Sequence, residues 1–263
     1  MKFFKTRNLV LTGAVLAVVG AILLIGGFAM GGFKNSIGFE DGRFQVVKNE
    51  STTQTRMLSS DIKKLFIDTN ALQISIKVGK EFSVKSQLIG RELTVTRPKE
   101  GDAAIISTTS DIGIQLFSFG FKNDESLVIT VPDKKQLREL RVSLDASNVD
   151  VDDLELLELS GKLAASNLSS NNLSVNSINF KDVEASQLNF NGMKLEKGGN
   201  IKMEASSLAI QNSQLPELAA EGEASYLKIN GKHIDLPYLL ADTLGIPGFL
   251  YINMEASGTT IED

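Results

Sequence analysis

The stretch that decides the fold is Ser143-Leu144-Asp145-Ala146-Ser147-Asn148-Val149-Asp150-Val151-Asp152-Asp153, because its pattern returns four more times towards the C-terminus. The later copies are AASNLSSNN at 164–172, EASQLNFNG at 184–192, EASSLAIQN at 204–212 and EASYLKING at 223–231. In each copy an apolar residue stands three positions after the Ala of an Ala-Ser pair. A turn-forming pair starts six positions after the same Ala. A further Ala-Ser pair at 256–257 gives successive Ala spacings of 19, 20, 20, 19 and 32 residues. Self-similarity with a period of ~20 residues is typical of a repeat protein.

Apolar and polar residues alternate within each copy, which is typical of β-strands, and the alternation changes phase at the Ala-Ser pair. Val142, Leu144 and Ala146 share one face, whereas Val149 and Val151 follow in the opposite phase. Such a change would send side chains to the wrong face unless the chain bends there. We therefore expect a corner at each Ala-Ser pair, with the small Ala facing inward. A second corner is expected at the Asn, Asp and Gly pairs, which tolerate left-handed backbone conformations.

The expected fold class is all-β. It is a single-stranded β-helix, or β-solenoid, in which coils of ~20 residues stack at ~4.8 Å. One transmembrane α-helix precedes it in the sequence. A third segment, such as Leu173 to Val175, completes each coil. Regular coils are expected over 141–232. Residues 233–250 interrupt the repeat as a short helix or lid bracketed by Pro237 and Pro247, and 251–263 form the final coil.

The solenoid domain as a whole is expected over 61–263. A first rung is predicted near 64–77, because Leu65, Ile67 and Thr69 alternate and Leu72 resumes the alternation in the flipped phase. Residues 78–140 are expected to flank or cap the solenoid with antiparallel strands. These strands are Phe82–Leu88, Glu92–Thr96, Ile114–Phe119 and Leu127–Val131.

Leu9 to Phe33 is a stretch of 25 residues without a charge. A helix of this length spans about 37 Å, enough to cross a hydrocarbon core of ~30 Å. Because Lys2, Lys5 and Arg7 precede the stretch, residues 1–8 are predicted to be cytoplasmic and the domain after the helix extracellular. The alternative is a cleaved signal peptide ending near Ala29-Met30-Gly31, although an apolar core of this length favours an anchor. The polar residues 34–60 are interpreted as a tether between membrane and solenoid.

Composition narrows the function classes. The chain has no cysteine, which removes disulfides, thiolate nucleophiles and thiolate metal sites. Beyond Lys34 there are 23 basic and 32 acidic residues, a net charge of −9. Nucleic acid is therefore not an expected partner, since phosphate binding needs a basic face. The expected partner is the membrane, together with a cell-wall, surface or membrane-protein partner; the oligomeric state is left open.

No catalytic, cofactor-binding or metal-binding residue is predicted, and the chain is not expected to be an enzyme. The sharpest acidic cluster is Asp145, Asp150, Asp152, Asp153 and Glu155. It lacks the loop spacing of a calcium site and is interpreted as a solvated strand face. His233, with only Asp235 beside it, is interpreted as an ordinary surface residue. The asparagines at 171, 172, 176 and 179 are expected to form ladders between coils.

The chain resembles the bacterial putative-adhesin family, the LiaG-like group of envelope proteins, over about 60–262. The resemblance rests on Phe66-Ile67-Asp68-Thr69-Asn70-Ala71-Leu72, on Leu127-Val128-Ile129-Thr130-Val131-Pro132, and on the coil from Leu144. It implies a β-solenoid on the surface of Gram-positive bacteria, sometimes linked to envelope-stress systems. Two functions follow as expectations: a non-catalytic surface-binding or adhesion module, or an accessory regulatory protein of an envelope-stress system. A polysaccharide-acting enzyme is disfavoured because no acid–base cluster is evident.

Overall fold

The computed structural model describes residues 35–40, 43–48, 51–89, 91–97, 103–110, 114–118, 125–238 and 248–262. The expected cytoplasmic residues 1–8 and transmembrane helix 9–33 lie outside them. Over the described ranges every regular element is a β-strand, and none is a helix long and apolar enough to cross a membrane. The chain divides into two compact units, Met1–Ser51 with Ser110–Asn123, and Thr52–Thr109 with Asp124–Asp263.

The smaller unit contains a three-stranded antiparallel sheet. Its strands are β1 (Asn35–Glu40), β2 (Arg43–Lys48) and β9 (Ile114–Ser118), in the order β2-β1-β9. The predicted strand at 114–119 therefore exists, but it pairs with β1 and does not belong to the solenoid. In the chain this unit interrupts the solenoid between β8 and β10.

The larger unit is built from two long sheets. The eleven-stranded sheet contains, in spatial order, β22 (Lys232–Ile234), β21 (Tyr226–Ile229), β24 (Gly258–Glu262), β19 (Ser207–Gln211), β16 (Gln187–Asn191), β14 (Asn167–Asn171), β12 (Asn148–Asp152), β5 (Gln73–Val78), β10 (Ser126–Val131), β6 (Ser83–Ile89) and β3 (Ser51–Met57). The ten-stranded sheet contains β20 (Glu217–Glu223), β23 (Phe249–Glu255), β18 (Gly198–Glu204), β15 (Ser174–Glu184), β13 (Glu155–Ala164), β11 (Glu139–Asp145), β4 (Lys64–Asn70), β8 (Ala103–Ser110) and β7 (Arg91–Thr96), with β17 (Lys194–Leu195) beside β15.

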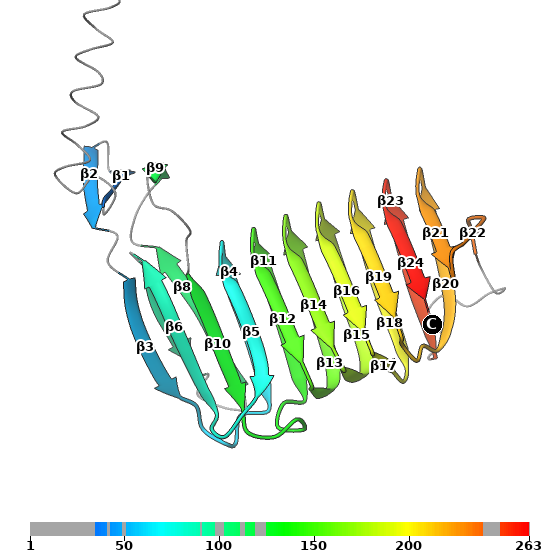
Figure 1. Ribbon diagram of the computed structural model, residues 1–263, viewed down its shortest axis with the longest axis horizontal. Helices are drawn as coiled ribbons and strands as arrows, with labels where there is room; N and C mark the ends of the chain where they lie inside the picture. Colours follow the sequence, from blue (N-terminus) through cyan, green and yellow to red (C-terminus); the bar gives the residue numbers. More distant parts are fainter. Residues whose placement is uncertain are drawn as a thin grey trace, which may run out of the picture. The chain divides into compact units, whose positions relative to one another are not determined.

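Each coil of the larger unit contributes one strand to each sheet, and neighbouring coils pair in parallel (Figure 1). The register is regular: Val149 of β12 pairs with Leu168 of β14, Leu168 with Leu188 of β16, and Leu188 with Leu208 of β19. The all-β solenoid predicted from the repeat is therefore confirmed. Its core consists of columns of apolar, mostly aliphatic side chains along the stack. Phe180 and Phe190 are the largest side chains that are fully buried. The third segment also packs inward, because Leu173, Val175 and Met193 are buried.

The corner at each Ala-Ser pair, here called the serine corner, differs from the prediction. The alanines are exposed and have positive φ, for example +46° at Ala185 and +48° at Ala205, whereas the following serines are buried, except for the half-buried Ser225. The expectation of an inward Ala is therefore wrong. The chain turns one residue earlier than the alternation suggested, at the Ala and the residue before it. This left-handed turn brings Ser186, not Ala185, onto the core face.

The second corner, here called the Asx corner, agrees with the prediction. Asp153, Asn172, Gly192 and Asn212 all have positive φ, between +50° and +67°. Asn and Asp tolerate this conformation because their short side chains bond locally, and Gly because it lacks Cβ.

The N-terminal end of the solenoid contains one coil more than predicted. The rung at 64–77 exists as β4 and β5, and its corner is Asn70-Ala71-Leu72, with Ala71 at φ +51°. A further coil, β8 with β10, stacks in parallel on its outer side. The predicted flanking strand at 127–131 is therefore part of a coil, and only β6 pairs antiparallel with it.

Within the expected tether 34–60, residues 35–40 and 43–48 form β1 and β2. The tether prediction is also wrong for residues 51–57. They form β3, which lies next to β6 at the edge of the eleven-stranded sheet. Most β3 side chains are exposed. A polar, Thr-rich segment can join a sheet because its main-chain bonds need no apolar face and Thr favours strands.

The C-terminal end also departs from simple stacking. The last coil, β23 with β24, lies between the coil of β18 and β19 and the coil of β20 and β21, so the coils are not stacked in chain order. At the glycine pair 198–199, an added Cβ on Gly198 would lie 1.9 Å from the Phe249 carbonyl oxygen, so glycine allows this close approach. The predicted helix or lid at 233–250 begins instead with strand β22, antiparallel to β21. The stretch 239–247 lies outside the described residues.

Candidate functional site

A groove of about 590 Å³ runs along the serine corners and is the candidate functional site. We call it the corner groove. Its floor is formed by the exposed alanines and their serine neighbours, and one wall by the first residue of each strand in the eleven-stranded sheet. The lining residues extend from Asn148, through the coils of Ala165, Ala185 and Ala205, to Tyr226 on the coil of β20 and β21.

The floor of the groove is held by a ladder of serine hydroxyls, which are buried except at the half-buried Ser225. Each serine Oγ donates to the carbonyl two residues earlier, as Ser186 does to Glu184 at 2.6 Å. The same Oγ accepts the backbone N–H of the preceding serine in the stack, as Ser186 does from Ser166 at 2.9 Å. The ladder runs through Ser147, Ser166, Ser186, Ser206, Ser257 and Ser225, in that spatial order.

The ladder explains why serine follows alanine in every copy. A backbone N–H buried without a partner costs about 1–3 kcal/mol, and the hydroxyl of the next coil supplies that partner. The left-handed alanine costs about 1–2 kcal/mol in return, because its Cβ approaches a carbonyl oxygen. The result is a narrow corner with only methyl groups on its outer side, which leaves the groove open.

A row of carboxylates lies beside the groove on the ten-stranded sheet. Glu184, Glu204, Glu255 and Glu223 each precede a corner alanine, are exposed, and stand in register on four adjacent coils. We call these four residues the glutamate row. Its members at Glu255 and Glu223 also line a second hollow of about 560 Å³, together with Glu221, Asn253 and Pro237.

Close to this hollow, Tyr251 projects from β23. Burial raises the pKa of its phenol to about 12, and a hydrogen bond with Glu221 acts in the same direction. Asn253 donates to Glu221 Oε1 at 2.6 Å. The Tyr251 hydroxyl is therefore protonated at physiological pH.

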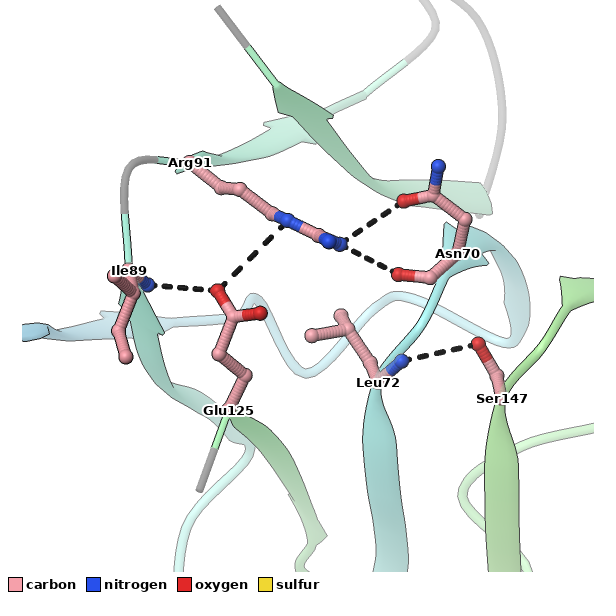
Figure 2. Close-up of polar contacts among 6 residues, drawn as sticks. All are labelled: Asn70, Leu72, Ile89, Arg91, Glu125 and Ser147. Carbon is pink, nitrogen blue, oxygen red and sulfur yellow. Dashed lines mark hydrogen bonds and ion pairs between the residues drawn. The ribbon is translucent and has the colours of Figure 1, made fainter. Parts of the chain in front are cut away.

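The N-terminal end of the serine ladder is closed differently (Figure 2). Leu72 occupies the serine position in its coil, and its N–H donates to Ser147 Oγ at 3.2 Å. In the next coil the equivalent position is Glu125, which is 4% exposed. Its Oε1 accepts the Ile89 N–H at 2.7 Å and lies 3.8 Å from Arg91 Nε, while Arg91 Nη1 donates to the backbone and side-chain oxygens of Asn70.

The side chains of the acidic cluster noted in the sequence have separate partners. Asp152 accepts from Asn171 Nδ2 at 2.9 Å, Asp153 accepts from Asn172, and Glu155 pairs with Lys134 and Lys135. Burial, followed by the charge of Asp152, raises the pKa of Asp150. Among the described residues no group of three acidic or histidine side chains could hold a metal ion.

Of the other residues noted in the sequence, Asn171 and Asn172 take part in side-chain ladders, as expected. His233 is exposed on β22, and its ring meets the Tyr226 ring edge-on at 6.3 Å. The glutamate row and Tyr226 were not predicted. The signal was present, because Glu-Ala-Ser occurs at 184, 204, 223 and 255, so that Glu precedes four of the six Ala-Ser pairs.

Comparisons with known proteins give a family and several similar structures. The family model described as "Toastrack DUF4097" matches residues 62–245. No curated protein matches the chain. A putative cell adhesion protein from Clostridium sporogenes is 13% identical, with 81% of this chain and 99% of that chain covered and a TM-score of 0.41. A putative adhesin from Bacteroides fragilis is also 13% identical, with 82% and 99% covered and a TM-score of 0.43.

Proposed function

Because the chain belongs to the DUF4097 Toastrack family, we propose that it is a membrane-anchored, extracytoplasmic binding module that acts without catalysis. The observation that carries the proposal is the corner groove, which crosses successive coils with a repeated set of small and amide side chains. Such a surface repeats at strand spacing, ~4.8 Å. It therefore suits an extended partner in the envelope, such as a wall polymer, a surface protein or a membrane protein.

The cellular location in this proposal rests on the sequence before the solenoid. The uncharged stretch 9–33 is long enough to span a bilayer, and the basic residues Lys2, Lys5 and Arg7 precede it. Positive residues are retained on the cytoplasmic side, so the solenoid would be exported.

The location and membrane orientation can be tested by cysteine labelling, because the chain contains no cysteine. Lys202 is exposed on β18, so a K202C variant should react with a membrane-impermeant maleimide on intact cells. A K5C variant should react only after the cells are permeabilised. Labelling of K5C on intact cells, or of K202C only after lysis, would refute the proposed orientation.

Binding can be tested by blocking the groove in the full-length protein. Ala205 is exposed in the groove, and Ala205→Lys places a long side chain across it. Leu157, half-exposed and outside the groove lining, gives the matched control Leu157→Lys. Cells with the wild-type chain or the control should bind immobilised envelope polymers and surface proteins better than cells without the chain, and Ala205→Lys should abolish the difference. Equal binding by all four strains, with altered transcription of envelope-stress genes in the deletion strain, would support a regulatory role instead.

A further inference from the structure

We propose that the C-terminal half of the corner groove binds a basic peptide segment in an extended conformation, with its lysine or arginine side chains over the glutamate row. The inference deepens the proposed function and rests on it: it names the chemistry of the partner that this groove accepts. Three features of the described surface carry it, namely an aromatic ring in the groove wall, an unneutralised row of carboxylates, and the spacing of that row.

Tyr226 is the exposed aromatic residue in the groove lining, with 46% of its surface accessible. It occupies the register position held by Asn167, Gln187 and Ser207 in earlier coils. Its neighbour in register is Gly258, where an added Cβ would lie 2.3 Å from Tyr226 Cζ. Glycine therefore allows the ring to lie across the adjacent strand instead of projecting into solvent.

The Tyr226 ring already attracts a cation. Lys228 Nζ lies 5.4 Å from the ring centroid, within the usual range of a cation–π contact. The ammonium or guanidinium group of a ligand that displaces Lys228 from this ring can be held in the same way.

The glutamate row supplies charge complementarity. Within the described part of the chain, none of Glu184, Glu204 and Glu255 forms an ion pair, and neither does Glu223, although seven ion pairs occur elsewhere in it. Like charges directly opposite on neighbouring strands destabilise a sheet. A bound polycation would relieve this repulsion.

The spacing of the row favours a peptide over a single ion. Four carboxylates on adjacent strands span about 14 Å at ~4.8 Å per step. In an extended peptide, side chains on one face repeat every ~6.8 Å, so three basic residues at alternate positions cover the same length. The described carboxylates do not converge into a metal-binding group, which leaves a distributed cation as the matching ligand.

The test uses the full-length chain in an uncharged detergent and a fluorescein-labelled peptide probe, Lys-Thr-Lys-Thr-Lys-Thr-Lys. Anisotropy should report saturable binding that weakens as salt is raised, since exposed charges are screened over ~8 Å at physiological ionic strength. The double variant Glu204→Gln/Glu255→Gln should weaken binding by about 5- to 10-fold. Tyr226→Leu should weaken it by about 2- to 5-fold, the size of an exposed cation–π contact.

Two controls decide the outcome. Glu158→Gln/Glu196→Gln removes the same number of charges away from the groove, and equal weakening by this pair would reduce the interaction to net charge and overturn the proposal. A probe of the same composition with its lysines in one block should bind more weakly, and equal affinity would refute the spacing argument. No binding of either probe would also overturn this inference, while surface labelling and envelope binding would still test the proposed function separately.

Discussion

The two corners of each coil solve the same steric problem with different chemistry. Both turn through a residue with positive φ, Ala at the serine corner and Asn, Asp or Gly at the Asx corner. At the serine corner the next side chain points inward, so a buried hydroxyl bonds the neighbouring coil. At the Asx corner the bonding side chains are exposed, as between Asn191 and Asn212 at 2.9 Å. The comparison shows that stability should depend on the serine corner, where water cannot replace a lost bond, much more than on the Asx corner.

The largest effect is expected at the N-terminal end of the serine ladder, where Glu125 occupies the serine position. Arg91→Ala leaves the buried Glu125 carboxylate without its cationic partner and should cost about 3 kcal/mol, the low end of the range for breaking a buried pair. The control Arg97→Ala affects the exposed pair with Asp61 and should cost less than about 1 kcal/mol. Urea denaturation of both variants measures the difference. Equal costs would show that the charge at the ladder position does not stabilise the fold.

The next effect separates the two corners directly. Ser186→Ala removes one donor and one acceptor and leaves the buried Ser166 N–H unpaired, so it should cost about 2 kcal/mol. Asn191→Ala removes exposed amide contacts and should cost about 0.5 kcal/mol or less. The two urea midpoints, compared at constant slope, check this ratio. Similar midpoints would mean that the serine ladder has no special role.

A smaller effect tests which way the corner alanine points. Because Ala185 is exposed at φ +46°, backbone strain and not space limits substitution there. Ala185→Val should cost about 1–2 kcal/mol, since β-branched residues fit the left-handed region poorly, and Ala185→Leu should cost less. An inward alanine predicts the opposite order, because leucine is the larger side chain. Thermal melts of the two variants distinguish the two geometries.

The smallest effect involves neither corner. Tyr251 keeps its proton up to a pKa of about 12, above the ordinary value of 10.0. A group whose pKa is raised by folding contributes stability below its unfolded pKa, and that contribution is lost as pH rises through the folded value. The domain should therefore lose stability between about pH 10 and 12, and Tyr251→Phe should remove this part of the loss. Absorbance at alkaline pH should show one tyrosine titrating late, and its absence would contradict the assigned environment.

The sequence predicted the coils well because their information is local and repeated. Alternation around Val149 and Leu168 requires strands, and the Asn-Gly and Asn-Asn pairs require left-handed turns. The inward serine was missed because Ala is small and also tolerates the turn better than a branched residue, so its repetition fits both an inward and an outward position. Only the hydrogen bonds between coils decide between them.

The order of the coils could not be predicted for a different reason. The strands of different copies have nearly the same pattern of apolar and polar residues, so the pattern alone does not say which copy pairs with which. Gly198, where an added Cβ would lie 1.9 Å from the Phe249 carbonyl oxygen, is the feature that favours insertion of the last coil. The glutamate row depends on that order as well, because Glu255 joins it only when β23 lies between β18 and β20.

The order of these coils is the claim on which the ladder, the groove and the glutamate row all depend, and the cysteine-free chain allows a direct measurement. Lys202 and Asn253 are partners in register on adjacent coils, whereas Glu221 lies one coil further along. A disulfide needs Cα atoms about 4.4–6.8 Å apart, which adjacent coils meet and coils two steps apart, at ~9.6 Å, do not. Oxidation of K202C/N253C should therefore give an intramolecular disulfide by peptide mass spectrometry, and oxidation of K202C/E221C should not. The reverse result would contradict the account, since it would place the coils in simple chain order.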